Sequence, residues 1–403
     1  MRHYIKLHED DNVIVALTDL ESGSTLTING EPLIVKENIK QGHKVAISKI
    51  SNNDFIIKYG YPIGHALKEI EPGTHVHTHN IKTNLNDCLS YEYQPNLKPD
   101  IRPLMDREIR AYYRKNWEIG IRNELWIIPT VGCVNKTAEI IKNEFLAQTE
   151  NLAIDGVFAF SHPFGCSQMG DDHETTRAIL QNIVKHPNAG GVLVLGRGCE
   201  NNQVEVFKET LGDYDEERVR FLVSQEVEDE VEAGVTILKE LYDLMKQDYR
   251  ATALLRNLKI GLKCGGSDGF SGITANPLLG YLSDYIVRSG GTTVLTEVPE
   301  MFGAETILMN RAKDEETFNK IVHLINDFKG YYERNHQVCY ENPSPGNKAG
   351  GITTLEDKSL GCTQKAGTSN VMDVLSYTDR VTQRGLNLLQ GPGNDLVAVT
   401  ALG

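Results

Sequence analysis

Four of the seven cysteines in this chain share one local setting. Each follows a short apolar run and has a glycine next to it in the sequence. The four are Cys133, Cys166, Cys199 and Cys264. A short apolar run closed by glycine is typical of a buried strand that leaves a sheet. Because the carboxyl ends of parallel strands lie at one edge of a sheet, where ligands bind, we expect the four thiols to meet in one crevice.

Thiols gathered in this way can bind a transition metal or an iron–sulfur cluster as thiolates. The alternative is that a free cysteine is a small buried apolar residue, and for any single cysteine that interpretation is the simpler one. Four cysteines in matching settings favour a functional role. No Cys-x-x-Cys pair occurs in the sequence, so the pattern is not that of a zinc ribbon or a ferredoxin.

A second group is a run of three alternate histidines, His75, His77 and His79. The side-chain period of a strand is two, so these imidazoles are expected on one strand face, about 7 Å apart. Imidazoles placed in this way can bind a metal, hold a carboxylate or move protons near neutral pH. The alternative is an exposed polar strand face.

Polar residues also follow strand-like runs or occupy glycine-rich loops. The loop from Lys263 to Gly272 could hold an anion on its backbone N–H groups, although a plain flexible loop is the alternative. Glu200 follows a strand-like run and is a carboxylate candidate for acid–base work. The further candidates, each weak by itself, are Arg197, Ser267, Asp268, Asn276 and Lys348.

The elements that must position these residues fall into two regions. Residues 1–92 contain short β-type runs between turns, at Val13–Leu17, Lys44–Ser48 and Phe55–Lys58, and this predicts a small all-β domain. Residues 93–104 carry three prolines without apolar periodicity, which is typical of a linker.

Residues 105–403 alternate strand and helix patterns, which predicts an α/β main region with an active site at its strand ends. Helical spacing marks 135–148, 172–184 and 226–245. The cysteines at 133, 166 and 199 are evenly spaced, and a βαβ unit of about 30 residues accounts for that period. The chain ends on an apolar run and a glycine, 396–403, which is typical of a strand and predicts an incomplete C-terminus.

Composition narrows the functional classes. The 403 residues carry a formal net charge of −14 with a pI near 5.4, which argues against nucleic acid as a partner. No apolar stretch approaches the roughly 20 residues of a membrane helix, and the first residues lack a secretory signal. An odd number of cysteines fits reduced thiols, so the cytoplasm is the expected compartment.

Several longer segments, taken together, resemble the altronate/galactarate dehydratase family. The segments that carry the resemblance are 120–123, 162–166, 195–200, 264–277, 342–351 and 356–362. The first 92 residues look like the SAF-type, β-clip domain of this family. The histidine run and Cys362 are more similar to the altronate branch than to the galactarate branch. The family continues beyond the position of Gly403, so the resemblance also implies a C-terminally incomplete chain.

The resemblance implies a metal-dependent hydro-lyase that removes water from a sugar acid. In the altronate branch the reaction turns D-altronate into 2-dehydro-3-deoxy-D-gluconate in hexuronate breakdown. Fe²⁺ is the metal that the resemblance implies, with Mn²⁺ and an iron–sulfur cluster as alternatives. The expected partner is a small sugar acid, with no nucleic acid and no membrane, and a homo-oligomer stays open.

On this interpretation the candidate residues take specific roles. The four cysteines would bind the metal or cluster. His75, His77, His79 and Glu200 would supply acid–base groups, and the sequence does not say which histidine is the base. The substrate carboxylate would be held by Arg197, Lys263 and Lys348, and its hydroxyls by Ser267, Asp268 and Asn276. The alternatives are a galactarate or other aldonate or aldarate dehydratase, and a non-catalytic fragment that binds sugar acids.

Overall fold

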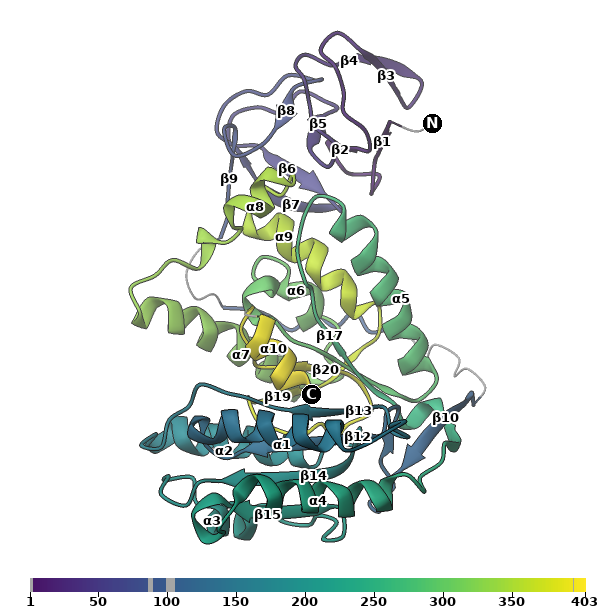
Figure 1. The fold of residues 1–403 in the computed structure, drawn as a ribbon. Coiled ribbons are helices and arrows are strands. Elements are labelled where there is room, and N and C mark those ends of the chain that lie inside the picture. The colour runs from purple at the N-terminus through teal and green to yellow at the C-terminus, as the bar shows by residue number, and fades with distance from the viewer. Residues whose placement is uncertain (1–2, 86–89, 99–105, 394) are drawn as a thin grey trace. The chain divides into compact units, whose positions relative to one another are not determined.

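The computed structural model describes residues 3–85, 90–98, 106–393 and 395–403. The chain forms two compact units. The first unit comprises residues 1–105, 259–377 and 381–402, and the second comprises residues 106–258, 378–380 and 403. The second unit is thus inserted in sequence between two parts of the first (Figure 1). Within the described residues, no helix combines the length and the apolar character needed to cross a membrane.

The first unit begins with the expected all-β domain, whose short strands pair antiparallel in sheets of order β1-β2-β5-β8, β3-β4 and β6-β7-β9. The strands are β1 (Tyr4–Ile5), β2 (Val13–Ala16), β3 (Thr25–Ile28), β4 (Glu31–Ile34), β5 (Lys44–Ala46), β6 (Phe55–Lys58), β7 (Tyr61–Ala66), β8 (His75–Val76) and β9 (Ile81–Lys82). The three strands expected from sequence are confirmed as β2, β5 and β6.

The rest of the first unit is built on a parallel sheet of order β17-β18-β20-β19. Its strands are β17 (Lys259–Leu262), β18 (Thr292–Leu295), β19 (Val371–Leu375) and β20 (Gly385–Leu389). The helices are α5 (Ala275–Arg288), α6 (Glu305–Met309), α7 (Glu315–Arg334), α8 (Pro345–Ala349), α9 (Leu355–Cys362) and α10 (Asp395–Leu402). The apolar face of α7 packs on the sheet through Phe318, Ile321 and Ile325.

Three buried charges join the all-β domain to α9. The Asp357 carboxylate accepts hydrogen bonds from the ammonium groups of Lys44 at 2.8 Å and Lys58 at 2.9 Å. Buried charges are stable only when paired, so this contact fixes α9 against β5 and β6. Glu356, the preceding residue on α9, accepts hydrogen bonds from Thr83 and from the backbone of Asn84.

The second unit contains a parallel sheet of order β13-β12-β14-β15 and a small antiparallel sheet of order β11-β10-β16. The strands are β10 (Glu108–Tyr113), β11 (Ile119–Gly120), β12 (Glu124–Pro129), β13 (Gly156–Ala159), β14 (Ala189–Gly196), β15 (Val219–Val223) and β16 (Ala251–Leu254). The helices are α1 (Asn135–Ala147), α2 (Gly170–Val184), α3 (Val204–Thr210) and α4 (Glu230–Met245).

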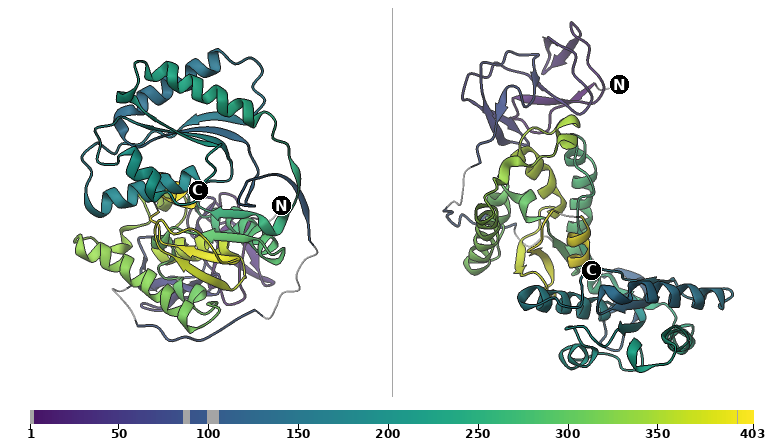
Figure 2. Two further views of the ribbon diagram at one scale, coloured as in Figure 1. Left: turned by 90° about the horizontal axis from the view of Figure 1, so that it is seen from below. Right: turned by 60° about the vertical axis from the view of Figure 1, so that its left-hand side comes forward.

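Helices cover both faces of the parallel sheet in this unit (Figure 2). Leu125 and Ile127 of β12 face α1 and α4, whereas Trp126 and Ile128 face α2 and α3. A strand that is buried on both faces has a continuous apolar sequence. The apolar run at β12 therefore predicted this buried strand. The helices expected at 135–148, 172–184 and 226–245 are confirmed as α1, α2 and α4.

The α/β class is confirmed, the expected C-terminal strand is wrong, and the structure adds detail to the expected α/β region and linker. The region expected to be one α/β region contains two parallel sheets that belong to different units. The final apolar run is the helix α10 rather than a strand, because a short apolar run without alternation fits either element. Residues 93–98 of the expected linker are hydrogen-bonded to the first unit. The Tyr93 hydroxyl donates to the Ala312 carbonyl, and the Asn96 N–H donates to the Asn310 carbonyl. The linker positions 99–104 lie outside the described residues.

Candidate functional site

Three of the four cysteines follow neighbouring strands of one sheet, and the fourth follows a strand of another sheet. Cys133, Cys166 and Cys199 follow β12, β13 and β14, which are neighbours in the sheet of the second unit. Cys264 follows β17, in the sheet of the first unit. The expectation of one shared edge is therefore wrong for Cys264, because the strand–glycine–cysteine pattern does not record which sheet a strand joins.

Glu200 organises the loop that carries Cys199. Its buried carboxylate accepts hydrogen bonds from the Thr130 hydroxyl at 2.7 Å and from the N–H groups of Arg197 at 3.0 Å and Gly198 at 2.6 Å. Burial alone would raise the pKa of Glu200, but these hydrogen bonds hold it below its ordinary value. A carboxylate satisfied in this way acts as a structural anchor. The Arg197 side chain is exposed.

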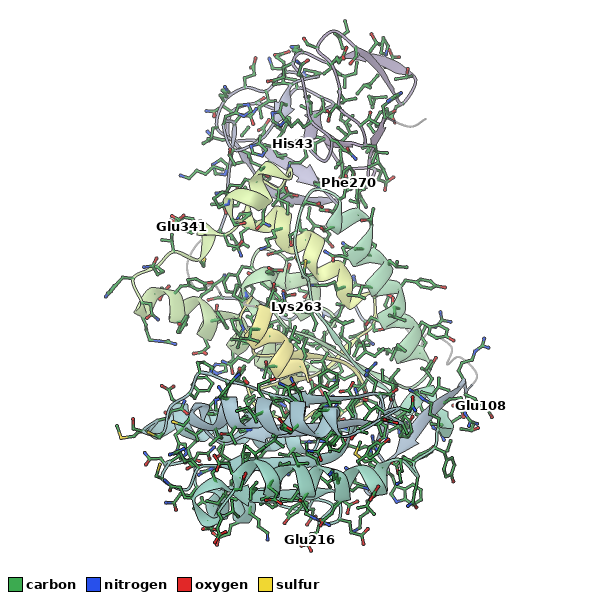
Figure 3. The ribbon with its side chains drawn as sticks, in the orientation of Figure 1. His43, Glu108, Glu216, Lys263, Phe270 and Glu341 are labelled. Atoms are coloured by element: carbon green, nitrogen blue, oxygen red, sulfur yellow. The ribbon has the colours of Figure 1, made fainter. Side chains whose placement is uncertain are left out.

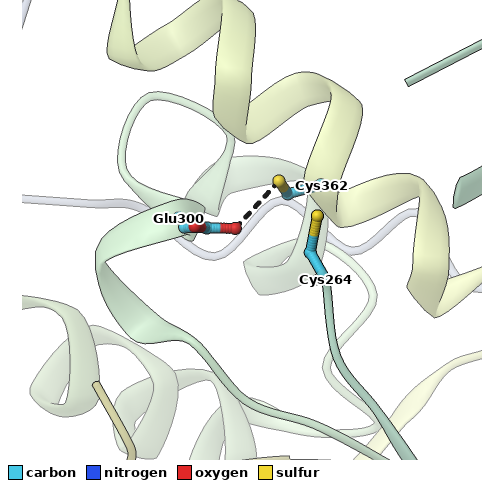
Figure 4. Close-up of side chains that lie close together, drawn as sticks. All are labelled: Cys264, Glu300 and Cys362. Atoms are coloured by element: carbon cyan, nitrogen blue, oxygen red, sulfur yellow. Dashed lines mark hydrogen bonds between the residues drawn. The ribbon is translucent and has the colours of Figure 1, made fainter. Parts of the chain in front are cut away.

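In the first unit, Cys264 lies beside two residues that were not assigned from sequence, Glu300 and Cys362 (Figure 4). One side-chain atom from each of the three lies within 4.8 Å of the others, and all three residues are buried. The Cys362 thiol donates to the Glu300 carboxylate at 2.9 Å, and the Ser267 hydroxyl lies 3.2 Å from the Cys264 sulfur. We call Cys264, Glu300 and Cys362 the buried thiol cluster.

Protonation differs between the two thiols of the buried thiol cluster. Hydrogen bonding to Cys362, assisted by Ser267 and by the charge of Lys365, lowers the pKa of Cys264 to about 6, although burial opposes this shift. The same hydrogen bond, burial and the Glu300 charge raise the pKa of Cys362 well above its ordinary value. Cys362 has one S–H, which can go either to Glu300 or to the Cys264 thiolate. The cluster therefore holds a shared proton at neutral pH.

The buried thiol cluster has the donor types of a soft-metal site, but its surroundings do not fit a resident divalent ion. The ammonium of Lys358 already pairs with Glu300 at 2.9 Å. A second ammonium, Lys365, pairs with Glu297 at 2.6 Å and lies close enough to influence the cluster. The two carboxylates beside the thiols are therefore already paired with lysines of the chain.

The histidines form a cluster of four rings in the all-β domain, because His43 joins the three expected from sequence. The ring centroids of His43, His75 and His77 lie 5.0 to 5.3 Å from one another, and the His79 ring lies 5.6 Å from that of His75. The expected single strand face is wrong: β8 ends at Val76, and a turn closed by the Asn80 side chain begins at His77.

Three imidazoles of the histidine cluster have lowered pKa values, and two of the three hydrogen-bond to α8. Burial lowers the pKa of His43 and His77, and burial together with the neighbouring imidazoles lowers that of His75 to about 3. His77 Nε2 lies 2.8 Å from the Lys348 carbonyl oxygen, and His43 Nε2 lies 3.1 Å from that of Ala349. Carbonyls only accept hydrogen bonds, so each ring donates its Nε2–H. Figure 3 labels His43 on the domain that makes this contact.

The glycine-rich loop links the histidine cluster to the buried thiol cluster. The Asn347 side chain donates to the Ser267 carbonyl at 2.8 Å, while the Ser267 hydroxyl contacts the Cys264 sulfur. Lys348 is half-buried, and no ion pair is formed by its ammonium within the described residues. Hydrogen bonds thus connect the segments that carry Cys264, Ser267, Lys348 and the histidines in the first unit.

The other residues expected to contact substrate have structural partners. Asp268 accepts hydrogen bonds from the N–H groups of Phe270 and Ser271, so it closes the turn of its own loop. Buried Asn276 donates to the Gly361 carbonyl on α9. Lys263 pairs with Glu297 at 3.3 Å and with Asp395; Figure 3 labels its position.

Sequence reasoning missed His43, Glu300, Lys358, Cys362 and Lys365. Cys362 ends a segment that carried the family resemblance, but it lacks the strand–glycine setting that selected the other cysteines. His43 precedes β5 and has no neighbouring histidine in sequence. Only the antiparallel pairing of β5 with β8 brings it to His75.

Three family models match the chain along most of its length. Residues 2–84 match the altronate/galactarate dehydratase SAF domain. Residues 111–246 match the second domain of D-galactarate dehydratase/altronate hydrolase, and residues 255–403 match the C-terminal domain of D-galactarate/altronate dehydratase.

Curated relatives match over nearly the whole chain. The altronate dehydratase of Escherichia coli (strain K12) is 58% identical over 99% of this chain and 81% of its own length. The altronate dehydratase of Bacillus subtilis (strain 168) is 57% identical over 100% of this chain and 81% of its own length. The galactarate dehydratase (L-threo-forming) of E. coli K12 is 33% identical over 98% of this chain and 78% of its own length.

Proposed function

The chain belongs to the D-galactarate/altronate dehydratase family, and we propose that it is a hydro-lyase that removes water from D-altronate to give 2-dehydro-3-deoxy-D-gluconate. The observation that carries the choice of substrate is the identity of 58% and 57% to two altronate dehydratases, against 33% to a galactarate dehydratase. The proposed metabolic setting is hexuronate breakdown in the cytoplasm, a reducing compartment that suits the free thiols.

Dehydration of a sugar acid sets three requirements. A base takes the weakly acidic proton beside the carboxylate, a positive group stabilises the charge that develops on that carboxylate, and an acid helps the neighbouring hydroxyl leave. We propose iron, with Mn²⁺ as the alternative ion, as a metal that would supply Lewis-acid stabilisation of the developing negative charge when bound.

Lys348 is the proposed partner of the substrate carboxylate. Its half-buried ammonium pairs with no carboxylate among the described residues, unlike that of Lys263. The segment that carries it is held on both sides, by His77 through the Lys348 carbonyl and by Asn347 through the Ser267 carbonyl. A charge-assisted hydrogen bond from an ammonium fixed in this way would orient the acid.

Cys264 is the proposed base. A base works best when its pKa lies near the working pH, and the pKa of about 6 for Cys264 leaves it as thiolate at neutral pH. The low pKa of His75 makes that imidazole a weak base. We assign His77 and His43 to positioning, because each holds α8 by a hydrogen bond to a backbone carbonyl.

The test is turnover of several sugar acids by the chain, supplied with Fe²⁺ and reductant without oxygen. Formation of a 2-keto acid is measured with altronate, galactarate and other aldonates as substrates. We expect kcat/KM to be highest for altronate. A higher kcat/KM with galactarate would overturn the substrate assignment, and thermal stabilisation by altronate without any turnover would favour a binding protein.

A further inference from the structure

A cavity of about 460 Å³ lies in the second unit, where the chain enters β14 and β15. Its lining residues fall within 113–116, 184–192 and 213–219, together with residue 248, and all belong to this unit. The segments that lead into parallel strands lie at one sheet edge, and the cysteine-bearing loops that follow strands lie at the other. Pockets for small molecules measure about 300–1,000 Å³, so the cavity has a suitable size. We call it the amino-edge cavity.

Two arginines form the framework of the amino-edge cavity. The Arg218 guanidinium donates to both oxygens of the Asp248 carboxylate at 2.8 Å and to the Gly190 carbonyl at 3.0 Å. The Arg114 guanidinium donates to the Pro187 carbonyl at 2.6 Å and lies 3.8 Å from the same carboxylate. Two positive charges therefore share one carboxylate, which leaves one positive charge in excess.

Lys185 adds a further cation to the lining of this cavity. It follows α2 directly, and its ammonium lies 3.7 Å from the position that a Cβ at Gly212 would occupy. Within the part of the chain that the structure describes, this ammonium forms no ion pair and no hydrogen bond. Burial, and then the charge of Arg380, lowers the pKa of Lys185, and the charge of Asp213 opposes this shift. A partly buried cation of this kind is stabilised by an anion that enters the cavity.

His186, the next residue, supplies a hydrogen-bond donor. Its Nδ1 accepts a hydrogen bond from the Asn188 N–H at 3.1 Å, so the proton of the neutral ring is on Nε2. Burial, and then the charge of Arg380, lowers the pKa of His186 to about 4, so the ring is neutral at pH 7. Among the described residues, its Nε2–H donates to no acceptor. Two adjacent residues of the lining can therefore donate to an incoming anion.

The segment before β15 adds carboxylates to the lining. The exposed Asp213 carboxylate accepts no hydrogen bond from the described residues, and the Asp215 carboxylate lies 3.7 Å from the Lys115 ammonium. Among the described residues that line the cavity, four are basic and three are aspartates. The lining thus has one positive charge in excess, although the whole chain has a net charge of −14. This balance suits a ligand with one negative group, and the aspartates can accept hydrogen bonds from its hydroxyl groups.

We propose that the amino-edge cavity binds a small hydroxylated monocarboxylate. Its carboxylate would accept hydrogen bonds from the Lys185 ammonium and from Nε2–H of His186. Its hydroxyl groups would donate to Asp213 and Asp215. This site belongs to the second unit, whereas Lys348 and Cys264 belong to the first, so the proposal does not rest on the proposed function.

The test compares three probes that share a six-carbon chain and differ in charge. Gluconate has one carboxylate, sorbitol has no charge, and glucose 6-phosphate has about two negative charges at neutral pH. Labelling of Lys185 in the full chain by an amine-reactive reagent is measured by mass spectrometry. We expect gluconate to protect Lys185, sorbitol to leave it unprotected and glucose 6-phosphate to protect it less than gluconate does. Lys142, which pairs with Glu139 on α1, is the control and should be labelled equally with every probe.

Binding of gluconate is then measured by calorimetry in a Lys348→Met background, which weakens the carboxylate site proposed for catalysis. Adding Lys185→Met should weaken gluconate binding by roughly 10- to 150-fold, which is the usual effect of losing a charged hydrogen bond. Adding Lys142→Met should leave binding unchanged. His186→Ala should weaken binding by roughly 2- to 12-fold, and His186→Gln, whose amide can replace the Nε2–H donor, should restore it.

Several results would overturn the proposal. Equal labelling of Lys185 with and without gluconate would show, in the parent chain, that the cavity does not bind it. Equal protection by sorbitol would show that the carboxylate is not recognised, and stronger protection by glucose 6-phosphate would exclude a monocarboxylate as the preferred ligand. Equal gluconate affinity with and without Lys185→Met would exclude Lys185 as its partner.

Failure of this proposal can be separated from failure of the proposed function. A chain in which gluconate protects Lys185 but which does not dehydrate altronate would keep the cavity and refute the function. A chain that dehydrates altronate while gluconate leaves Lys185 unprotected would keep the function and refute the cavity.

Discussion

At the scale of single residues, proton sharing sets the chemistry of the buried thiol cluster. Cys264 and Cys362 are the same residue type at the same site, yet the pKa of one is lowered to about 6 and the pKa of the other is raised. The difference arises because Lys365, Ser267 and the shared hydrogen bond stabilise one negative charge, while Glu300 and burial disfavour a second. Two acidic groups that share one buried site rarely ionise together, because their like charges repel each other.

The first prediction concerns Cys264 as the base. The thiolate is the active form, so kcat/KM should rise with pH through about 6 and then level off. Cys264→Ser should lower kcat by roughly 10²–10⁴-fold, which is the usual contribution of general acid–base catalysis. The pH profile of kcat/KM and the thermal midpoint of the variant are the measurements. A drop of less than about threefold, well below that range, or a flat profile through this pH range would exclude the role.

The second prediction concerns Lys348 as the group that binds the substrate carboxylate. A hydrogen bond to a charged group contributes about 1.5–3 kcal/mol, so Lys348→Met should raise KM by roughly 10- to 150-fold. The effect on kcat should be smaller. Lys68→Met, at an exposed lysine of the all-β domain, is the control and should leave KM unchanged. Equal KM values in the two variants would contradict the assignment.

At the scale of elements, α9 connects the all-β domain to the rest of the first unit. One of its carboxylates, Asp357, pairs with two lysines of that domain, and all three side chains are buried. Burial alone would raise the pKa of Asp357, but the charges of Lys44 and Lys58 hold it well below its usual range. The all-β domain also contacts α8, through hydrogen bonds from His77 and His43. We therefore expect the Asp357 contact to help hold the histidine cluster against α8.

The third prediction follows from that contact. Removing one partner from a buried ion pair costs about 3–5 kcal/mol, so Asp357→Asn should lower the free energy of unfolding by about this amount. The folded-state pKa is lowered, so the stabilisation is present above about pH 4 and lost as pH falls below it. Denaturant unfolding at several pH values measures both effects.

A matched control for Asp357→Asn is Glu69→Gln, which removes an exposed ion pair with Lys49. Exposed pairs contribute little to stability, so this variant should unfold at nearly the same denaturant concentration as the parent. The structural role of the contact would be contradicted if Asp357→Asn unfolded at the same denaturant concentration as the parent. It would also be contradicted if the free energy of unfolding fell equally in parent and variant between pH 7 and pH 3.

At the scale of the whole molecule, the chain divides into two units with separate cores. Residues 106–258 form a parallel sheet with an apolar core on each face, and this part lies between two segments that together build the first unit. A segment with its own core on both sheet faces has what a domain needs in order to fold alone.

The fourth prediction tests that division. A protein made of residues 106–258 should be folded and should unfold cooperatively, because the two cores of its sheet lie within these residues. Circular dichroism and denaturant unfolding are the measurements. A chain of the same length taken from residues 180–332, which cuts both sheets, is the control and should not unfold cooperatively. Absence of a cooperative transition in the 106–258 protein would show that the second unit depends on the first.

The sequence by itself determined the elements and the class of the fold. Buried strands such as β12 appear as continuous apolar runs, and amphipathic helices such as α1 and α4 show the helical period, because both patterns follow from local backbone geometry. The family resemblance likewise follows from short segments of the sequence and needs no tertiary structure. The sequence also pointed to Cys264, Ser267 and Lys348, since each lies in a short distinctive segment.

Only the tertiary structure decided which of these residues meet. Cys264 and Cys133 have the same local pattern, but strand order places them in different sheets. His43 reaches His75 through the pairing of β5 with β8, and Cys362 reaches Cys264 through the packing of α9. Local patterns record how a segment buries its own side chains. Contacts between distant segments depend on the burial of apolar faces and the pairing of charges across the whole unit, which no single segment encodes.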